Sequence, residues 1–115
     1  ELLVRIEKIL ERSGKRKEEC IRIRDVCIYP GRRLVTRGGT EVALKPMEFD
    51  CLMMFVRYKN IALTREQLLA GLWGVEFDGE TRTVDVHVGR IRKKLDFWDV
   101  IRTIPRIGYR LEVEE

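Results

Sequence analysis

Residues 82–95 constrain the fold most, because their polarity repeats with the period of an α-helix. At about 100° per residue, four apolar residues fall on one side of such a helix: Val84, Val88, Ile91 and Leu95. A continuous apolar seam of this kind must face a core. The pattern therefore predicts an amphipathic helix that packs one narrow face against the rest of the domain.

The opposite side of this helix carries cations and small contact groups. Arg82, Val86, Arg90 and Lys93 lie there, with Thr83 and His87 at one edge and Asp85 and Arg92 at the other. An arginine can donate two hydrogen bonds to guanine, a valine or threonine methyl can touch a thymine methyl, and other cations can neutralise phosphates. The face suits either a DNA major groove or a solvated basic surface, and the helix alone does not separate the two.

Positive charge is concentrated in the same part of the chain. The 115 residues carry a formal net charge of +4. Residues 82–110 contain eight Arg and Lys against three Asp, so the rest of the chain is nearly neutral. A local basic surface favours a polyanionic partner.

The cysteines and the hydropathy pattern restrict the classes of protein further. Cys20, Cys27 and Cys51 are odd in number and lack C-x-x-C spacing, so we expect no zinc site, disulfide framework or other cofactor. Unpaired cysteines suit a reducing, cytoplasmic compartment. No apolar run approaches the ~20 residues of a membrane span, so we expect no membrane partner.

The first nineteen residues differ in pattern from the rest. Residues 1–13 are predicted to form an amphipathic helix with its apolar residues on one stripe, and the polar residues 14–19 are interpreted as a linker. Residues 1–13 would then be the last helix of a preceding domain, and 20–115 the main domain. The alternative, in which this helix belongs to the main domain, stays open.

Residues 20–44 lose the helical period and show short apolar pairs instead. Pro30-Gly31 and Gly38-Gly39 divide these pairs, which predicts a small antiparallel meander of three or four strands. A supporting role is expected for this sheet.

Helices and a hairpin are predicted after the meander. Pro46 suits the first turn of a helix. The capping-box pattern Thr64-Arg65-Glu66-Gln67 predicts a second helix that ends near residues 73–74. Strands over 100–103 and 109–113, around Pro105 and Gly108, predict a terminal hairpin.

Six motifs follow one another along residues 20–115: Leu44-Lys45-Pro46-Met47-Glu48-Phe49, Thr64-Arg65-Glu66-Gln67-Leu68-Leu69, Leu72-Trp73-Gly74, Arg82-Thr83-Val84-Asp85-Val86-His87-Val88, Arg90-Ile91-Arg92-Lys93-Lys94-Leu95 and Gly108-Tyr109-Arg110. In this order they resemble the effector domains of OmpR/PhoB-family response regulators. Residues 1–13 resemble the final helix of that family's phosphorylatable receiver domain.

The resemblance implies a fold and a way of binding. The fold is α+β, a winged helix-turn-helix with a four-stranded N-terminal antiparallel sheet, three helices and a C-terminal β-hairpin wing. Helix 82–95 would enter the major groove, and the wing would approach the adjacent minor groove. The residues expected to contact DNA are Arg82, Thr83, Val86, His87, Arg90, Arg92, Lys93, Lys94, Thr103, Arg106 and Tyr109.

The resemblance also implies partners. The loop that follows the second helix is expected to engage RNA polymerase through Val75, Glu76, Phe77 and Asp78. Two copies are expected to bind direct repeats in double-stranded promoter DNA as a homodimer. A sensor histidine kinase is expected to act through a receiver domain, so that phosphorylation controls transcription.

The chain departs from the family pattern in three places. Gly89 stands where the family often has a basic residue, which removes a contact and costs about 1 kcal/mol relative to alanine within a helix. In the wing, Pro105 takes the place of the usual arginine, and Arg106 follows it. Lys45 stands where a Thr or Ser cap is usual, so a weakly capped helix start is expected.

The sequence offers little for an enzyme. His87 is the only histidine and belongs to no recognisable catalytic or metal set, so we do not expect an enzyme. A winged helix used only for protein contact remains the alternative, although it has less need of basic residues on the helix and hairpin. Asp85 is expected to pair with Arg92 or to act as a first-turn anion. Trp73 and Trp98 are expected to serve core or hinge packing rather than base stacking, and Met47, Met53 and Met54 to lie in or near the core.

Overall fold

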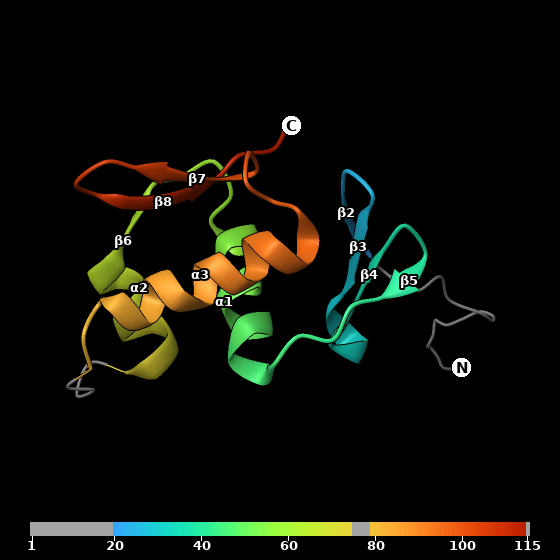
Figure 1. Cartoon of the computed structure of the whole chain (residues 1–115), viewed down its shortest axis with the longest axis horizontal. Helices are drawn as coiled ribbons and strands as arrows, with labels where there is room; N and C mark the ends of the chain where they lie inside the picture. Colours follow the sequence, from blue (N-terminus) through green and yellow to red (C-terminus); the bar gives the residue numbers. More distant parts are fainter. Residues whose placement is uncertain (1–19, 75–78, 115) are drawn as a thin grey trace, which may run out of the picture.

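The computed structural model describes residues 20–74 and 79–114. A four-stranded sheet lies to one side of a body of three helices, and a three-stranded sheet covers that body (Figure 1). This is the predicted winged-helix architecture. The helix predicted over 1–13, the linker 14–19 and the loop 75–78 lie outside the described residues.

The N-terminal sheet pairs strands that follow one another along the chain. Its order is β2 (Ile21–Ile23), β3 (Val26–Tyr29), β4 (Leu34–Arg37) and β5 (Thr40–Glu41), all antiparallel. A 3-10 turn, η1 (Pro30–Arg32), joins β3 to β4, and Gly38 and Gly39 take positive φ angles between β4 and β5. Glycine reaches such angles at little steric cost. The predicted meander is confirmed.

Helix α1 (Pro46–Arg57) begins at the predicted proline and buries Phe49, Leu52 and Phe55. The side chain of Lys45 makes no capping hydrogen bond, as expected. Glu48 compensates in part, because its Oε1 accepts the backbone N–H of Lys45 at 3.0 Å. The helix start is thus stabilised by a carboxylate in the first turn.

Helix α2 (Arg65–Trp73) has the predicted capping box. Thr64 Oγ1 accepts the N–H of Gln67 at 2.9 Å, and Gln67 Oε1 accepts the N–H of Thr64 at 2.8 Å. Two backbone donors that a helix start leaves unpaired are thereby satisfied.

Helix α3 (Arg82–Leu95) has the predicted bounds. Its apolar seam, composed of Val84, Val88, Ile91 and Leu95, is buried against the rest of the domain. The helix ends at Asp96, whose backbone is left-handed with φ at 55°.

The C-terminal sheet contains one strand more than the predicted hairpin. Strands β7 (Ile101–Ile104) and β8 (Gly108–Leu111) form the wing, and β8 also pairs with β6 (Leu63–Thr64), so the order is β6-β8-β7. The approach of β6 requires a glycine, because a Cβ at Gly108 would lie 2.0 Å from the carbonyl oxygen of Leu63. Non-local pairing thus ties the wing to the segment that precedes α2.

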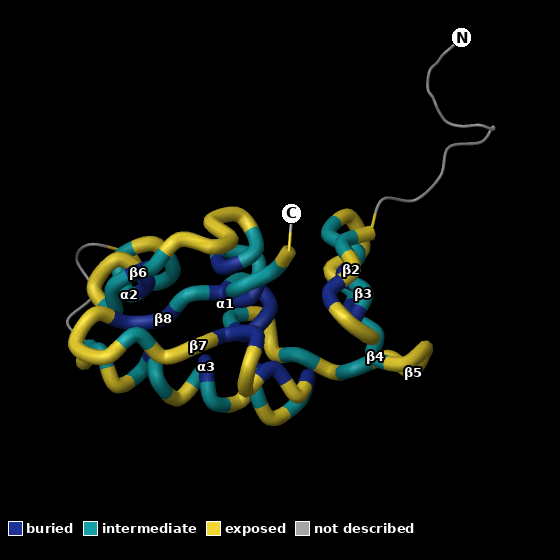
Figure 2. Tube along the Cα trace, turned by 90° about the horizontal axis from the view of Figure 1, so that it is seen from above, coloured by how far each residue is buried: buried dark blue, intermediate teal, exposed yellow. Residues whose placement is uncertain are grey.

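Within residues 20–74 and 79–114, the buried apolar residues form one hydrophobic cluster that reaches from the N-terminal sheet to the wing. Figure 2 shows buried stretches on the helices, on β8 and in the N-terminal sheet, whereas the tip of the wing is exposed. Among the described residues, no helix combines the length and the apolar character that crossing a membrane requires.

Candidate nucleic-acid interface

One side of α3 presents an exposed column of side chains. Arg82, Val86, Arg90 and Lys93 are all exposed, and Val86 is a large apolar residue with 43% of its surface accessible. The helical period brings these four residues together on the side opposite the buried seam. The column therefore combines three cations with one apolar contact group.

His87 is held beside this column rather than free at its edge. Its Nδ1 lies 2.9 Å from the carbonyl oxygen of Thr83, so this nitrogen carries the proton that is donated. The ring also meets Trp73, the last residue of α2, edge-on with 5.0 Å between ring centroids. Trp73 is partly buried against the core. His87 thus links the first turns of α3 to the end of α2.

Asp85 has partners other than the predicted Arg92. Its Oδ1 accepts a hydrogen bond from Arg65 Nε at 2.8 Å and another from the hydroxyl of Tyr109 at 2.5 Å. Burial raises the pKa of Asp85, but the hydrogen bonds from Tyr109 and Arg65 outweigh it and leave the pKa below its usual value. The expected pairing with Arg92 is wrong, because the helical period does not show that Arg65 and Tyr109 approach from other elements. The other expectation, an anion in the first turn of α3, is confirmed.

Tyr109 lies beneath the surface, not on it. Only 5% of the residue is exposed, and the guanidinium groups of Arg65 and Arg92 each lie 5.1 Å from its ring centroid. Burial, together with the hydrogen bond to Asp85, raises the pKa of Tyr109. The hydroxyl expected to contact DNA instead joins β8 to α3 and α2.

Arg92 connects α3 to the first strand of the wing. Its Nε and Nη2 donate to the carbonyl oxygen of Ile101 at 2.9 and 2.6 Å, and Nη2 also donates to Thr103 Oγ1 at 2.8 Å. Burial lowers the pKa of Arg92, although an arginine remains protonated at neutral pH. This side chain thus sets the position of β7 relative to α3.

Lys94 is directed toward α1 and away from the exposed column. Its Nζ donates to Glu48 Oε1 at 2.7 Å and to the carbonyl oxygen of Ala43 at 3.0 Å. Glu48 has no exposed surface. Burial raises its pKa, but the hydrogen bonds from Lys94 and from the N–H of Lys45 outweigh that effect and lower it. The ammonium of Lys94, which was expected to contact DNA, is thus bound to Glu48 and to the backbone of Ala43.

The wing tip presents Arg106 to solvent. Ile107 N–H donates to the carbonyl oxygen of Ile104 at 3.0 Å, which closes a turn over Pro105 and Arg106. Arg106 has a positive φ of 68°. Arg110 is engaged elsewhere, because its Nη2 lies 2.5 Å from Glu112 Oε2. Arg106 is therefore the exposed cation at the tip of the hairpin.

Trp98 does not lie in the core, so the first of its two expected roles, core or hinge packing, is wrong. The residue is 58% exposed, and the guanidinium of Arg92 lies 5.6 Å from the centroid of its ring. It lines a depression between α3 and β7 together with Arg92, Asp99, Arg102 and Thr103. The sequence contains no signal for this exposure, because tryptophan normally indicates burial.

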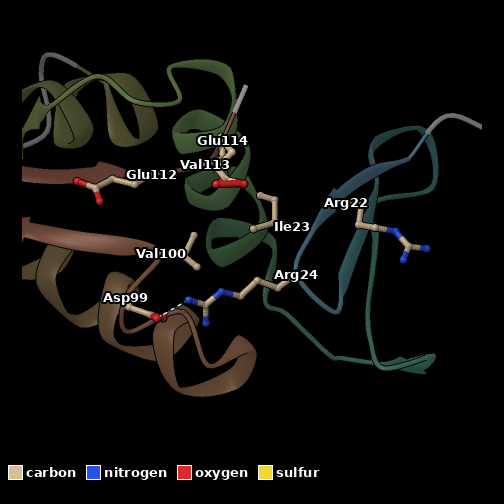
Figure 3. Close-up of a pocket in the computed structure, with 8 residues that line it drawn as sticks. All are labelled: Arg22, Ile23, Arg24, Asp99, Val100, Glu112, Val113 and Glu114. Atoms are coloured by element: carbon tan, nitrogen blue, oxygen red, sulfur yellow. Dashed lines mark hydrogen bonds and ion pairs between the residues drawn. The ribbon is translucent and has the colours of Figure 1, made fainter.

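A second hollow separates the N-terminal sheet from the body. It measures about 430 Å³, and Arg24 of the β2–β3 turn crosses it to form an ion pair with Asp99, while Arg22 points away (Figure 3). Arg37 adds a hydrogen bond of 3.2 Å to the carbonyl oxygen of Lys94 near the end of α3. Polar contacts therefore connect this sheet to the C-terminal end of α3.

The described residues contain no group of three His, Cys, Asp or Glu side chains that could hold a metal ion. The thiols are free in this part of the chain. Cys20 is exposed and Cys51 is buried. Burial raises the pKa of Cys51 to about 12, so its thiol is protonated at neutral pH.

Comparison with known proteins assigns a family. A family model described as "Transcriptional regulatory protein, C terminal" matches residues 39–111. The regulatory protein VanRB of Enterococcus faecalis is 40% identical over 111 residues, which is 96% of this chain and 50% of VanRB. The chain spans about half the length of the curated relatives it matches.

Solved structures agree with this assignment. The crystal structure of the Klebsiella pneumoniae RstA DNA-binding domain in complex with the RstA box has a TM-score of 0.72 at 35% identity, covering 82% of this chain and 97% of that one. The response regulator DrrB, a Thermotoga maritima OmpR/PhoB homologue, has a TM-score of 0.75 at 26% identity, covering 89% and 48%. The chain therefore belongs to the OmpR/PhoB-type family of transcriptional regulatory protein C-terminal domains.

Proposed function

We propose that this domain is the output module of a two-component response regulator and binds promoter DNA in a sequence-specific manner. The observation that carries the proposal is the exposed column of Arg82, Val86, Arg90 and Lys93 on a helix whose opposite face is buried. The RstA domain, whose crystal structure is a complex with its DNA box, supports it. In this proposal α3 is the recognition helix and lies in the major groove.

Base reading is assigned to the middle of the column. Arg90 stands beside Val86 and projects from the exposed side of α3, so it is the candidate for a bidentate contact with guanine. Val86 and Thr83 would contact thymine methyls. Arg82 and Lys93, near the two ends of the column, would neutralise phosphates.

The other residues that were expected to contact DNA fall into two groups, those that would touch DNA and those that would support the residues that do. His87 and Thr103 stand beside the exposed surfaces and would make direct contacts with DNA. Arg92, Lys94 and Tyr109 would act by holding the wing and helix in place, since their polar groups are bound to other parts of the domain.

The wing would approach the minor groove through Arg106. Pro105 removes one backbone donor and fixes φ near −65°, so Arg106 is presented by a rigid turn. A narrow, A·T-rich minor groove has the most negative potential and attracts an inserted arginine. We assign this groove to Arg106.

The family supports a proposal for the wider biological setting. A homodimer on direct repeats, phosphorylation of a receiver domain by a sensor histidine kinase, a cytoplasmic location and the absence of enzymatic activity belong to this proposal. Contact with RNA polymerase through Val75, Glu76, Phe77 and Asp78 also belongs to it, and that loop lies outside the described residues.

The test begins with selection of bound sequences from a random duplex pool. One recurrent motif should emerge, and affinity for it should fall with salt with a log–log slope of about −0.9 per phosphate contact. Arg90→Ala should cost about 1–3 kcal/mol at one base pair and relax preference there. A flat salt response, or binding to heparin that no DNA sequence displaces, would argue for a protein-contact module instead.

A further inference from the structure

The depression beside Trp98 lies between the two DNA-binding elements of the proposed function. Its lining comes from α3 through Arg92, from the turn after α3 through Trp98 and Asp99, and from β7 through Arg102 and Thr103. Its volume is about 460 Å³. The indole of Trp98 is the most exposed of the large apolar side chains in the described part of the chain.

Trp98 is exposed on a rigid support. Its neighbour Phe97 is completely buried, and Val100, two residues later, is 3% exposed, so the backbone on both sides is anchored in the core. The guanidinium of Arg92 lies 5.6 Å from the indole centroid and is itself fixed by its hydrogen bonds to Ile101 and Thr103. The buried neighbours Phe97 and Val100 and the guanidinium of Arg92 therefore restrict the position of the exposed ring.

The geometry of duplex DNA determines what passes over this surface. Each major groove is separated from the adjacent minor groove by one sugar–phosphate strand. If α3 occupies the first groove and the wing the second, that strand must run between α3 and β7. The depression lies at this place.

The charges of the depression suit such a strand. The side chain of Arg102 is 59% exposed, and its Nε lies 3.9 Å from Oε1 of Glu112, at the long end of an ion pair. Asp99 is the one acidic residue in the lining, and its charge is offset by the ion pair with Arg24. An indole offers one N–H donor and a flat apolar face, and Thr103 adds a hydroxyl.

We propose that Trp98 and Arg102 bind the sugar–phosphate strand that separates the two grooves. The indole N–H donates to a phosphate oxygen, its ring lies against a deoxyribose, and Arg102 neutralises the phosphate. These contacts are independent of base sequence and add to those of the recognition helix and the wing tip. The inference rests on the DNA-binding function proposed above.

Fluorescence gives a direct readout of Trp98. In the Trp73→Phe variant Trp98 is the only tryptophan of the chain. A duplex carrying the selected motif should shift its emission and protect it from acrylamide, a neutral quencher that does not alter the ionic strength. Full acrylamide access to Trp98 in the DNA complex would overturn the proposal.

Affinity measurements separate the two contacts. Trp98→Phe keeps an aromatic ring but removes the donor, and should weaken selected and scrambled duplexes alike by about three- to ten-fold, with an unchanged salt slope. Arg102→Gln should reduce the salt slope by about 0.9. Ile61→Ala, at a residue that is 54% exposed, and Arg22→Gln, in the N-terminal sheet, are the matched controls and should bind as wild type does.

The outcomes distinguish this inference from the function on which it rests. A wild-type protein that binds no duplex with a salt-dependent affinity overturns both. A wild-type protein that binds its selected motif, while Trp98→Phe and Arg102→Gln match the controls, overturns only the role of the depression.

Discussion

The N-terminal sheet pairs consecutive strands, whereas the C-terminal sheet places β6 beside β8, with α2, α3 and β7 between them in the chain. The first sheet meets the helical body through exposed polar contacts such as Arg24–Asp99, in addition to its buried residues. The second is joined to α3 through partly buried groups, Arg92 and the Asp85–Tyr109 pair. The difference indicates that the wing and the recognition helix form one rigid surface, to which the first sheet is attached more loosely.

The largest expected effect comes from a single methyl group in the C-terminal sheet. In Gly108→Ala the new Cβ would lie 2.0 Å from the carbonyl oxygen of Leu63, which is backbone and cannot move aside cheaply. Unfolding free energy from urea titration should fall by about 3 kcal/mol or more. Gly89→Ala is the matched control, because nothing lies within 4 Å of its Cβ, and should stabilise the domain by up to about 1 kcal/mol. Equal stabilities for the two variants would contradict the tight pairing of β6 with β8.

Lys94 connects α3 to the segment between the first sheet and α1. Its ammonium donates hydrogen bonds to Glu48 at the start of α1 and to the carbonyl oxygen of Ala43, which follows the first sheet. Lys94→Met leaves the buried carboxylate of Glu48 without its cation and should cost about 3 kcal/mol. Adding Glu48→Gln should restore much of that loss, because an amide is less costly to bury.

Lys94→Met alone should also reverse the way in which Glu48 makes the stability of the domain depend on pH. In the wild type the folded pKa of Glu48 is lowered, so its contribution is present above about pH 4.3, the unfolded value, and disappears as the pH falls further. Without Lys94, burial dominates and raises the folded pKa. The variant should then gain stability relative to the wild type as the pH falls from 7 toward 5. Parallel stability curves from urea titrations across this range would contradict the assigned pairing.

Tyr109→Phe tests the contact between β8 and α3. Loss of the hydroxyl leaves Asp85 with Arg65 alone, at an expected cost of about 1 kcal/mol. Asp85 has a lowered pKa, so its contribution is lost on acidification, and the variant should show less of that loss in urea titrations at low pH. Tyr58→Phe, at a tyrosine that is 41% exposed, should leave stability unchanged. Equal acid sensitivity in Tyr109→Phe and wild type would remove Asp85 from the contact.

The smallest effect is expected at the junction of the first sheet. Arg37→Ala removes the hydrogen bond to the carbonyl oxygen of Lys94 and two loose ion pairs, with Asp25 at 3.8 Å and Asp96 at 4.0 Å. Because these groups are substantially exposed, about 0.5 kcal/mol is expected. Hydrogen exchange should quicken in β2–β4 and stay unchanged in β8. Equal acceleration in both sheets would show that they unfold as one unit.

Local patterns in the sequence were sufficient for much of the fold. The period of residues 82–95 predicted both the buried seam of α3 and its exposed column, and the Thr64–Gln67 capping box predicted the start of α2. These features depend on neighbours within one or two helical turns. The pairing of β6 with β8 joins distant segments and leaves no such local trace.

The partners of the long side chains could not be predicted in the same way. Helical period gives the direction in which Arg92 and Lys94 leave α3, but not which element lies opposite them. Arg92 meets β7, and Lys94 meets α1. For the same reason the sequence did not decide between core and hinge packing for Trp98, whose neighbours Phe97 and Val100 are buried while its own ring is exposed.

The turn at the tip of the wing affects how much conformational entropy the wing loses when it binds DNA. Pro105 has one fixed backbone angle, and Arg106 sits in a left-handed conformation that a residue with a Cβ seldom adopts freely. The tip has therefore given up most of its backbone freedom before any ligand arrives, and ordering it again on binding costs little entropy. The arginine that we assign to the minor groove is in this sense preorganised, with only the rotamers of its own side chain left to restrict.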